Sequence, residues 1–222
     1  MTETDPFPGA ARLPEHEATY RRLRDMVLFG LLAPGQKVTI QGITRSLGAG
    51  MTPVREAIRR LTAEGALELH ENRRVSVPRL TRSQLEELAF ARLALEPKLA
   101  QMAQAHILPE RIEALERIDA EIDAAIAAGD VQGYLAGNYR FHLAIYEQAN
   151  APILLAITQS LWLRFGPSLR VMIESGGSIG PDRHREAVAA MRSGDPAALA
   201  RAIEDDIAQG LEGVRRDLGK AA

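Results

Sequence analysis

The sequence contains no cysteine among its 222 residues. This absence excludes a secreted scaffold held by disulfides, a metal site built from thiolates and a cysteine nucleophile. The chain also has no apolar run that approaches the roughly 18 residues of a membrane-spanning helix. Acids and prolines stand near the N-terminus, where a signal peptide would carry basic residues and an apolar segment. We therefore expect a cytoplasmic protein that does not bind membranes.

Charge of neither sign dominates the chain, whose formal net charge is -2 at pH 7. The two parts of the sequence nevertheless differ. Residues 1–79 carry 12 Lys and Arg against 9 Asp and Glu, a net charge of +3, whereas residues 80–222 carry a net charge of -5. A mildly basic segment joined to an acidic one suits a protein in which only the first part meets phosphate groups.

The first part of the chain has the pattern of a small DNA-binding domain, which we place at residues 13–79. Apolar residues at helical spacing predict three helices, over about 15–29, 40–47 and from Thr52 to Gly65. Thr52 is a good N-cap, and Pro53 follows it at the first helical position. Alternating apolar residues over 66–77 then predict a β-hairpin. Two short helices followed by a hairpin are typical of a winged helix-turn-helix.

One exposed face of the third helix carries side chains expected to read DNA, because the second helix of a helix-turn-helix pair enters the major groove. Thr52, Arg55 and Arg59 lie on this face. Thr52 and the N-terminal amides can hold a phosphate, and Arg55 can reach a base edge, ideally of guanine. Arg73 and Arg74 at the hairpin tip can contact the DNA backbone or the minor groove. From spacing alone, the alternative is a solvated helix face and a charged turn.

The second part of the chain, residues 80–222, shows helical patterns throughout. Thr81 is the expected N-cap of a long first helix. Further helices are predicted over about 109–128, 130–149, 151–173, 181–193 and 195–217. Short connections between helices of this length favour an antiparallel bundle of about six helices. The predicted fold class is therefore mainly α, with a winged helix-turn-helix before an all-helical domain.

Three of the predicted helices each direct a metal-binding residue type toward the bundle centre. Asn138 and His142, four residues apart, share one inward face, and His184 and Asp206 lie on the inward faces of two other helices. A buried polar group needs a partner, so three such faces suggest a shared site. The oxygen and nitrogen donors suit zinc, nickel or manganese. A lone buried histidine is more often a hydrogen-bonded core residue, and this alternative stays open.

A more specific signal is the stretch that contains a PG turn, TPVREAIRRLTAEG and the basic hairpin. It resembles the N-terminal domain of the GntR family of bacterial regulators, which implies DNA binding. The residues that match the family's contact positions or its wing are Arg45, Thr52, Arg55, Arg73 and Arg74. Gly50-Met51 stand where the family usually has Ser-Arg, so an arginine that commonly touches DNA is missing. This departure leaves the operator sequence open.

Residues 81–217 resemble the FCD ligand-binding domain of the FadR-type branch of that family. The segments that carry the resemblance are ARLALE (91–96), NYRFH (138–142), DRHREAVAAMRSGD (182–195) and AIEDDI (202–207). Many members hold a divalent metal through one Asp or Asn and three histidines. Asn138, His142 and His184 fall on three of those positions, and Asp206 stands at the fourth, where histidine is usual. The resemblance thus implies a divalent metal ion, zinc first, with nickel or manganese as alternatives.

The same resemblance implies that a small carboxylate metabolite binds over the metal. Arg92 begins the R-x-x-x-E pattern of the first bundle helix and can pair with such an anion. Arg140 and Arg164 are further candidates for effector binding. The competing interpretation of Arg92 is an ion pair within its own helix, with Glu96 four residues later.

These inferences predict a ligand-responsive transcription regulator, not an enzyme, that represses genes for the use of a small organic acid. We expect a homodimer, because a two-fold symmetric protein reads a palindromic operator. Metabolite binding would favour a dimer geometry that no longer matches the half-site spacing. One alternative is a metal-dependent enzyme-like bundle fused to a DNA-binding domain, since such a metal can activate water. Another is a bundle that only dimerises.

Overall fold

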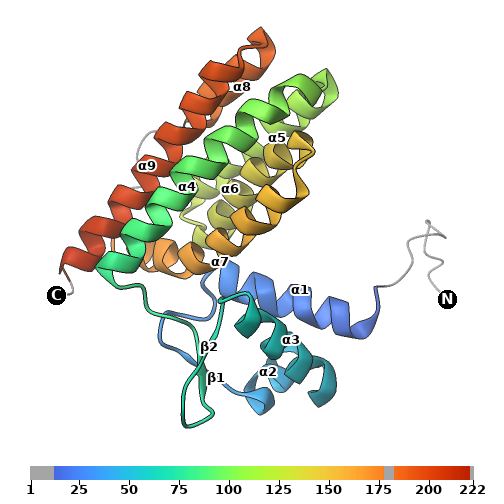
Figure 1. The fold of residues 1–222 in the computed structure, drawn as a ribbon, viewed down its shortest axis with the longest axis vertical. Helices are drawn as coiled ribbons and strands as arrows, with labels where there is room; N and C mark the ends of the chain where they lie inside the picture. The colour runs from blue at the N-terminus through green and yellow to red at the C-terminus, as the bar shows by residue number, and fades with distance from the viewer. Residues whose placement is uncertain (1–12, 178–182, 221–222) are drawn as a thin grey trace.

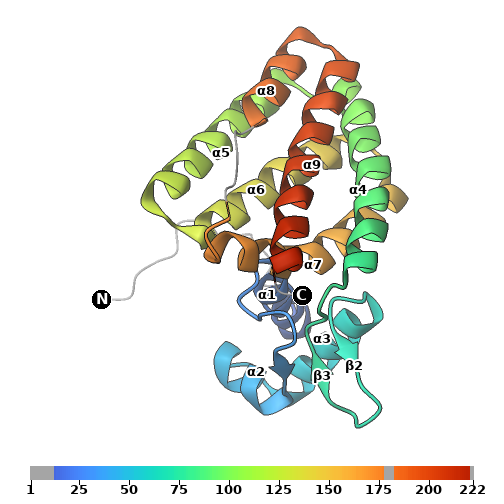
Figure 2. The ribbon, with the colours of Figure 1, turned by 90° about the vertical axis from the view of Figure 1, so that its left-hand side faces the viewer.

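The computed structural model describes residues 13–177 and 183–220, which form a helical bundle and a smaller domain below it (Figure 1). The elements of the smaller domain are α1 (Glu15–Leu28), β1 (Lys37–Val38), α2 (Ile40–Leu47), α3 (Met51–Ala63), β2 (Glu68–Leu69) and β3 (Val75–Ser76). Figure 2 shows α2, α3 and the loop between β2 and β3 at the end of the molecule away from the bundle. This is the predicted winged helix-turn-helix.

A third strand joins the predicted hairpin, so the wing is an antiparallel sheet in the order β1-β3-β2. Val75 of β3 pairs with Leu69 on one side and with Val38 on the other. Strand β1 has only two residues, too few for an alternating pattern to reveal it in the sequence. The added strand ties the base of the wing to the segment that leads into α2.

The two helices of the helix-turn-helix begin in different ways. Helix α2 begins where predicted, and the hydroxyl of Thr39 caps it by accepting a hydrogen bond from the N–H of Gly42 at 3.0 Å. Helix α3 begins two residues earlier than predicted, with Gly50 rather than Thr52 as its N-cap. Pro53 therefore occupies the third helical position. Its missing N–H costs nothing there, because the N–H groups of the first turn have no acceptor within the helix.

Six α-helices form the bundle in the described part of the chain, as predicted. They are α4 (Arg82–Ala103), α5 (Pro109–Ala128), α6 (Val131–Tyr146), α7 (Pro152–Glu174), α8 (His184–Ser193) and α9 (Pro196–Lys220). Thr81 caps α4 in a reciprocal arrangement with Gln84, each side chain accepting from the other residue's N–H. The predicted start of α8 near residue 181 lies outside the described residues. No helix within 13–177 and 183–220 is both long and apolar enough to cross a membrane.

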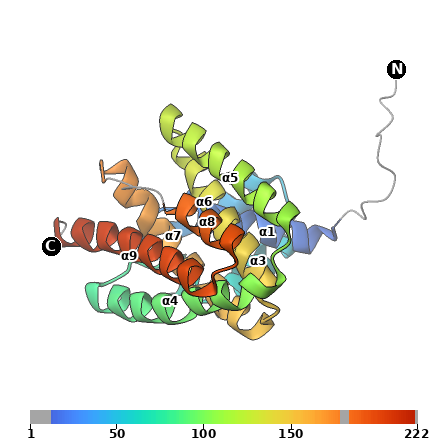
Figure 3. The same ribbon diagram turned by 90° about the horizontal axis from the view of Figure 1, so that it is seen from above.

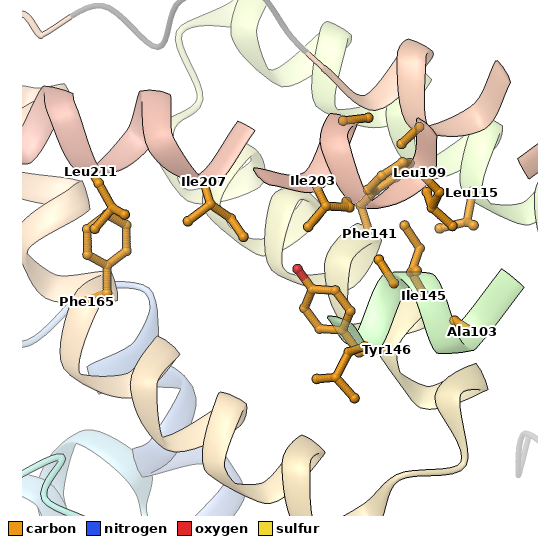
Figure 4. Packing of buried hydrophobic residues seen from close by; sticks show 14 of the residues in the cluster. Ala103, Leu115, Phe141, Ile145, Tyr146, Phe165, Leu199, Ile203, Ile207 and Leu211 are labelled. Atoms are coloured by element: carbon orange, nitrogen blue, oxygen red, sulfur yellow. The ribbon is translucent and has the colours of Figure 1, made fainter. Parts of the chain in front are cut away.

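Helix α9 runs beside α4 (Figures 1 and 3) and supplies a buried apolar stripe to the bundle core. The stripe consists of Leu199, Ile203, Ile207 and Leu211. Figure 4 shows it facing Phe141 and Tyr146 of α6 and Phe165 of α7, with the Tyr146 hydroxyl directed toward α9. All three rings are at most 2% exposed. Polar side chains on these inward faces therefore lie in apolar surroundings.

Helix α7 joins the bundle to the winged domain. Trp162 and Leu163 of α7 and Tyr139 of α6 pack into the hydrophobic core of the winged domain, which is thus completed by the bundle. The two backbones also come close at Gly166, where an added Cβ would lie 1.9 Å from the carbonyl oxygen of Leu28 at the end of α1. Glycine at this position permits a helix contact that any side chain would block.

Candidate DNA interface and effector site

Helix α3 presents the predicted DNA-reading side chains to solvent. Thr52, Arg55 and Arg59 are all exposed, opposite the buried stripe of the helix. Arg59 is paired with Glu56, and its Nε lies 3.2 Å from Oε2 of that carboxylate. Arg55, by contrast, makes no ion pair with any residue in the described ranges. It can therefore bind a phosphate or a base edge without losing an existing partner.

Further cations lie on α2 and at the wing tip. Arg45 is exposed in the last turn of α2, and Arg73 and Arg74 are exposed in the loop between β2 and β3. Arg73 has a left-handed backbone with φ of 60°, the conformation that a three-residue hairpin loop requires and that favours glycine. A hollow of about 440 Å³ separates the wing from the start of α2, and Lys37 and Gln41 line it together with the two wing arginines. Sequence reasoning did not single out Lys37 or Gln41.

The structure brings together the four residues predicted to bind a metal, from three helices. Asn138 and His142 lie on α6, His184 begins α8 and Asp206 lies on α9. His142 Nε2 is 3.0 Å from Oδ2 of Asp206, and His184 Nε2 is 3.1 Å from Oδ1 of Asn138. One possible ligand atom from each of the two histidines and Asp206 lies within 4.8 Å of the others. Two imidazoles, a carboxylate and an amide thus surround one small space, a donor set that suits a divalent ion.

A chain of hydrogen bonds determines which ring nitrogen of His142 carries hydrogen. Tyr146 donates its hydroxyl hydrogen to Oε2 of Glu96 at 2.8 Å. Burial, and then the charge of Glu96, raise the pKa of Tyr146 well above its usual value, so the hydroxyl keeps this hydrogen. The hydroxyl oxygen is then the acceptor for Nδ1 of His142, 2.9 Å away. In neutral His142, the lone pair of Nε2 therefore faces the carboxylate of Asp206.

A buried carboxylate orients His184 in a similar way. Oδ1 of Asp119, on α5, lies 3.2 Å from Nδ1 of His184 and accepts its hydrogen. Nε2 of neutral His184 then presents its lone pair to Oδ1 of Asn138. Lone pairs that face oxygen atoms repel them, and a cation placed among the four ligand atoms would convert both contacts into attraction. Sequence reasoning missed Asp119, because it is one of many acids on its helix.

The charges around the site also fit a divalent cation. Asp119, Asp206 and Glu96 carry three negative charges in their ionised forms. Arg92 is the only Lys or Arg among the described residues that line the adjoining cavity. Uncompensated charge is costly in a buried site. Arg183 also interacts electrostatically with Asp206. A divalent ion on the four ligands would offset the carboxylate charge that the guanidinium groups leave unbalanced.

A cavity of about 40 Å³ adjoins the candidate ligands, and Arg92 lies in its wall. The Arg92 guanidinium stacks near the rings of Trp162 and Phe165, 4.4 and 4.6 Å from their centroids. Its Nε and Nη2 donate to the carboxylate of Glu96 at 2.5 and 3.3 Å. The structure therefore contains the Arg92–Glu96 ion pair, and it also places Arg92 where a ligand in the cavity would meet it.

The other two effector candidates do not line this cavity. Arg140 is exposed on α6, and its Nη2 donates to Oε2 of Glu121 at 2.6 Å. Arg164 is exposed on α7, and its Nη2 lies 3.3 Å from the carbonyl oxygen of Glu64 in the winged domain. An effector held beside the metal ligands would not touch either side chain.

A winged helix-turn-helix joined to a helical bundle is the architecture of a DNA-binding regulator. The comparisons with known proteins identify the family. The family model described as "Bacterial regulatory proteins, gntR family" matches residues 15–77, and the model described as "FCD domain" matches residues 87–209. The chain belongs to the GntR family and carries an FCD domain, as its motifs predict.

The relatives are transcription regulators. The chain is 30% identical over 185 residues to the HTH-type transcriptional regulator McbR of Escherichia coli (strain K12), covering 82% of each chain. It is 28% identical over 197 residues to a probable D-xylose utilization operon transcriptional repressor of Paenarthrobacter nicotinovorans, covering 84% of each. A solved structure of E. coli McbR/YncC matches with a TM-score of 0.85 at 25% identity, over 92% of this chain and 99% of that one. The chain is thus a DNA-binding transcription regulator, and the enzyme alternative is wrong.

Proposed function

We propose that this regulator is a repressor that releases its operator when a small carboxylate metabolite binds in the cavity beside a divalent metal ion. The observation that carries the proposal is the convergence of Asn138, His142, His184 and Asp206. Asn138, His184 and Asp206 also line the adjoining cavity. Repression is supported by the relative described as an operon repressor. The controlled genes would serve the use of the same small organic acid.

The metal would be held by two oriented imidazoles and two oxygen donors. His142 and His184 would bind through Nε2, because Tyr146 and Asp119 already engage the Nδ1 atoms. Asp206 would supply an anionic oxygen and Asn138 a neutral one. Zinc suits this mixed set, and nickel or manganese accept the same donors. The bound ion would attract the carboxylate group of the metabolite as a Lewis acid.

Aromatic side chains connect the cavity wall to the DNA-binding domain. Trp162, in the wall, donates from Nε1 to Oε2 of Glu96 at 3.0 Å, and its ring meets Tyr139 edge-on at 5.4 Å. Tyr139 in turn accepts a hydrogen bond from Arg24 of α1 and contacts Phe29 with ring centroids 6.1 Å apart. Helix α1 packs against α3. A ligand that shifts Trp162 would therefore displace α1 together with the DNA-reading helix.

We assign DNA binding to residues 13–79 and effector binding with dimerisation to residues 80–222. The proposed DNA contacts are Arg45, Thr52, Arg55, Arg59, Arg73 and Arg74. A homodimer is proposed because two copies of α3 related by a two-fold axis would match a palindromic operator. A protein that binds operator DNA acts where bacterial DNA lies, which supports a cytoplasmic location.

Operator release tests the proposal. The metal-loaded protein is bound to a labelled operator fragment selected from random DNA, and small carboxylates are titrated into the complex. We expect at least one acid to release the DNA from the parent protein. His142→Ala should bind the operator as well as the parent does but should not respond to the acid. His106→Ala, an exposed histidine outside the site, is the matched control and should respond normally. A normal response by His142→Ala would place the effector elsewhere.

A further inference from the structure

Helix α3 begins with an exposed apolar side chain beside the proposed DNA contacts. Met51 is the first residue of α3 and is 53% exposed. Thr52 and Arg55, which follow it outside the buried stripe of the helix, are polar and also exposed. We infer that Met51 packs against the C5-methyl group of a thymine in the major groove and so selects thymine at one position of each operator half-site. This inference rests on the proposed DNA contacts of α3.

The position of Met51 in the helix places it at the base edges. In a helix-turn-helix, the N-terminal residues of the second helix contact the bases. The N-cap residue Gly50 has no side chain to accept from the N–H groups of the first turn, so a DNA phosphate can bind them. Glu15 accepts from the N–H of Gly50 itself at 3.4 Å, one residue before the helix. A phosphate at the first turn would hold Met51 against the groove.

The chemistry of methionine selects thymine among the four bases. The thioether is a weak hydrogen-bond acceptor and not a donor, so it cannot replace the hydrogen bonds that polar base edges make with water. Thymine presents a methyl group in the major groove, and apolar side chains pack against that group. Contact between the methyl group and Met51 removes apolar surface of both from water, which favours binding. The flexible and polarizable side chain of methionine adapts readily to such a contact.

Helix geometry places this thymine close to the base that Arg55 contacts. Met51 and Arg55 are four residues apart in α3 and are therefore neighbours on the helix surface. Four residues of an α-helix rise by about 6 Å, and successive base pairs are about 3.4 Å apart. The thymine should therefore lie within about two base pairs of the guanine proposed for Arg55.

Deoxyuridine differs from thymidine only by the missing methyl group, so its substitution tests the inference on the parent protein. Each thymine of an operator fragment selected from random DNA is replaced in turn by deoxyuridine, and gel-shift titrations measure the affinity. One replacement near the base that depends on Arg55 should weaken binding about fourfold for each half-site. An operator without thymine near that base, or with thymines there that tolerate replacement, would overturn the inference.

Variants of Met51 identify the side chain that contacts the methyl group. Met51→Gln keeps the length and helix propensity of the side chain but makes its end polar, so it should bind the thymine and deoxyuridine operators equally. Met51→Leu keeps an apolar end and should still prefer thymine. Leu31→Ala is the matched control and should keep the parent's preference. Leu31 is 50% exposed and lies beyond the end of α1, whose first residue, Glu15, is the one beside Gly50.

The outcomes separate this inference from the proposed function when Arg55→Ala is titrated against the same DNA fragments. If Met51→Gln keeps the parent's preference for thymine, another residue contacts the methyl group and the inference is overturned. Weaker binding by Arg55→Ala, together with no effect of deoxyuridine on the parent, would overturn the role of Met51 and leave the other contacts of α3 standing. No effect of either change would contradict the proposed DNA contacts of α3 themselves.

Discussion

The proposed DNA-binding surface and the proposed effector cavity of this regulator are built in opposite ways. On the surface, Arg55 is exposed and makes no ion pair within the described residues, so it is available to bind DNA. At the cavity wall, Arg92 is 2% exposed, and it pairs with the fully buried Glu96 and stacks on aromatic neighbours. Substitutions on the surface should therefore act separately, whereas those in the cavity should be coupled to one another and to folding.

The largest expected loss of stability follows from substituting Glu96, the buried carboxylate that connects three helices. Glu96 accepts hydrogen bonds from Arg92, Tyr146 and Trp162. Glu96→Gln keeps the size of the side chain but leaves the charge of Arg92 buried without a counter-ion. The free energy of unfolding should fall by about 3–5 kcal/mol, measured by urea denaturation. Glu87→Gln, on the exposed face of the same helix, is the control. Equal stabilities of the two variants would show that the buried pair contributes nothing.

The next largest change is expected in zinc affinity, when the residue that orients His184 is substituted. Asp119→Asn replaces the carboxylate that fixes Nδ1 of His184, and zinc affinity should fall about 10–100-fold. Competition with a chromophoric chelator measures the affinity, and the visible spectrum of the Co²⁺-loaded protein reports the ligand geometry. Asp123→Asn removes an exposed carboxylate one turn away, paired with Arg185, and should leave both unchanged. If Asp119→Asn matches the parent in both measurements, Asp119 does not position His184.

Among single substitutions on the proposed DNA-binding surface, replacement of Arg55 should weaken operator binding most. Arg55→Ala should weaken operator binding by about 1–3 kcal/mol and relax base preference at one position of each half-site. A gel-shift titration against a set of single-base operator variants measures both. Arg59→Ala is the comparison, and we expect a smaller loss because Arg59 already has Glu56 as a partner. Unchanged affinity and preference in Arg55→Ala would remove it from the interface.

Substitutions in the wing should change DNA affinity least, and the change should depend least on DNA sequence. Arg73 and Arg74 are expected to contact phosphates, and replacing both by Ala should reduce the slope of log K against log salt concentration by about two. Arg73→Gly separates charge from strain, because glycine adopts the positive φ of this position more readily. It should reduce the slope by about one without destabilising the wing. A slope equal to that of the parent in the double variant would exclude phosphate contacts.

The local parts of the fold could be predicted from the sequence. The helices and the wing follow from apolar spacing, caps and glycine breaks, which are local signals. The missed strand β1 and the early start of α3 depend on pairing and on backbone geometry at Gly50, which residue type does not reveal. The candidate DNA-binding residues could be named from the sequence because each one lies on an exposed face of a single element.

The residues around the cavity could be predicted only in part, because their contacts join helices that are distant in the sequence. The inward faces of three helices identified His142, His184 and Asp206 as neighbours. The sequence could not show that Asp119 and Tyr146 orient the imidazoles, because those contacts join helices that lie far apart in the chain. It also could not decide between the two interpretations of Arg92, since the same side chain pairs with Glu96 and lines the cavity.

The most direct test of this account is the metal content of the protein. Elemental analysis is performed on protein purified without chelators or a metal-affinity tag, beside His142→Ala and His106→Ala. We expect about one divalent ion per chain in the parent and in His106→Ala, and loss of the ion in His142→Ala. A parent protein that contains no divalent metal, and that binds none when zinc, nickel or manganese is added, would contradict the account.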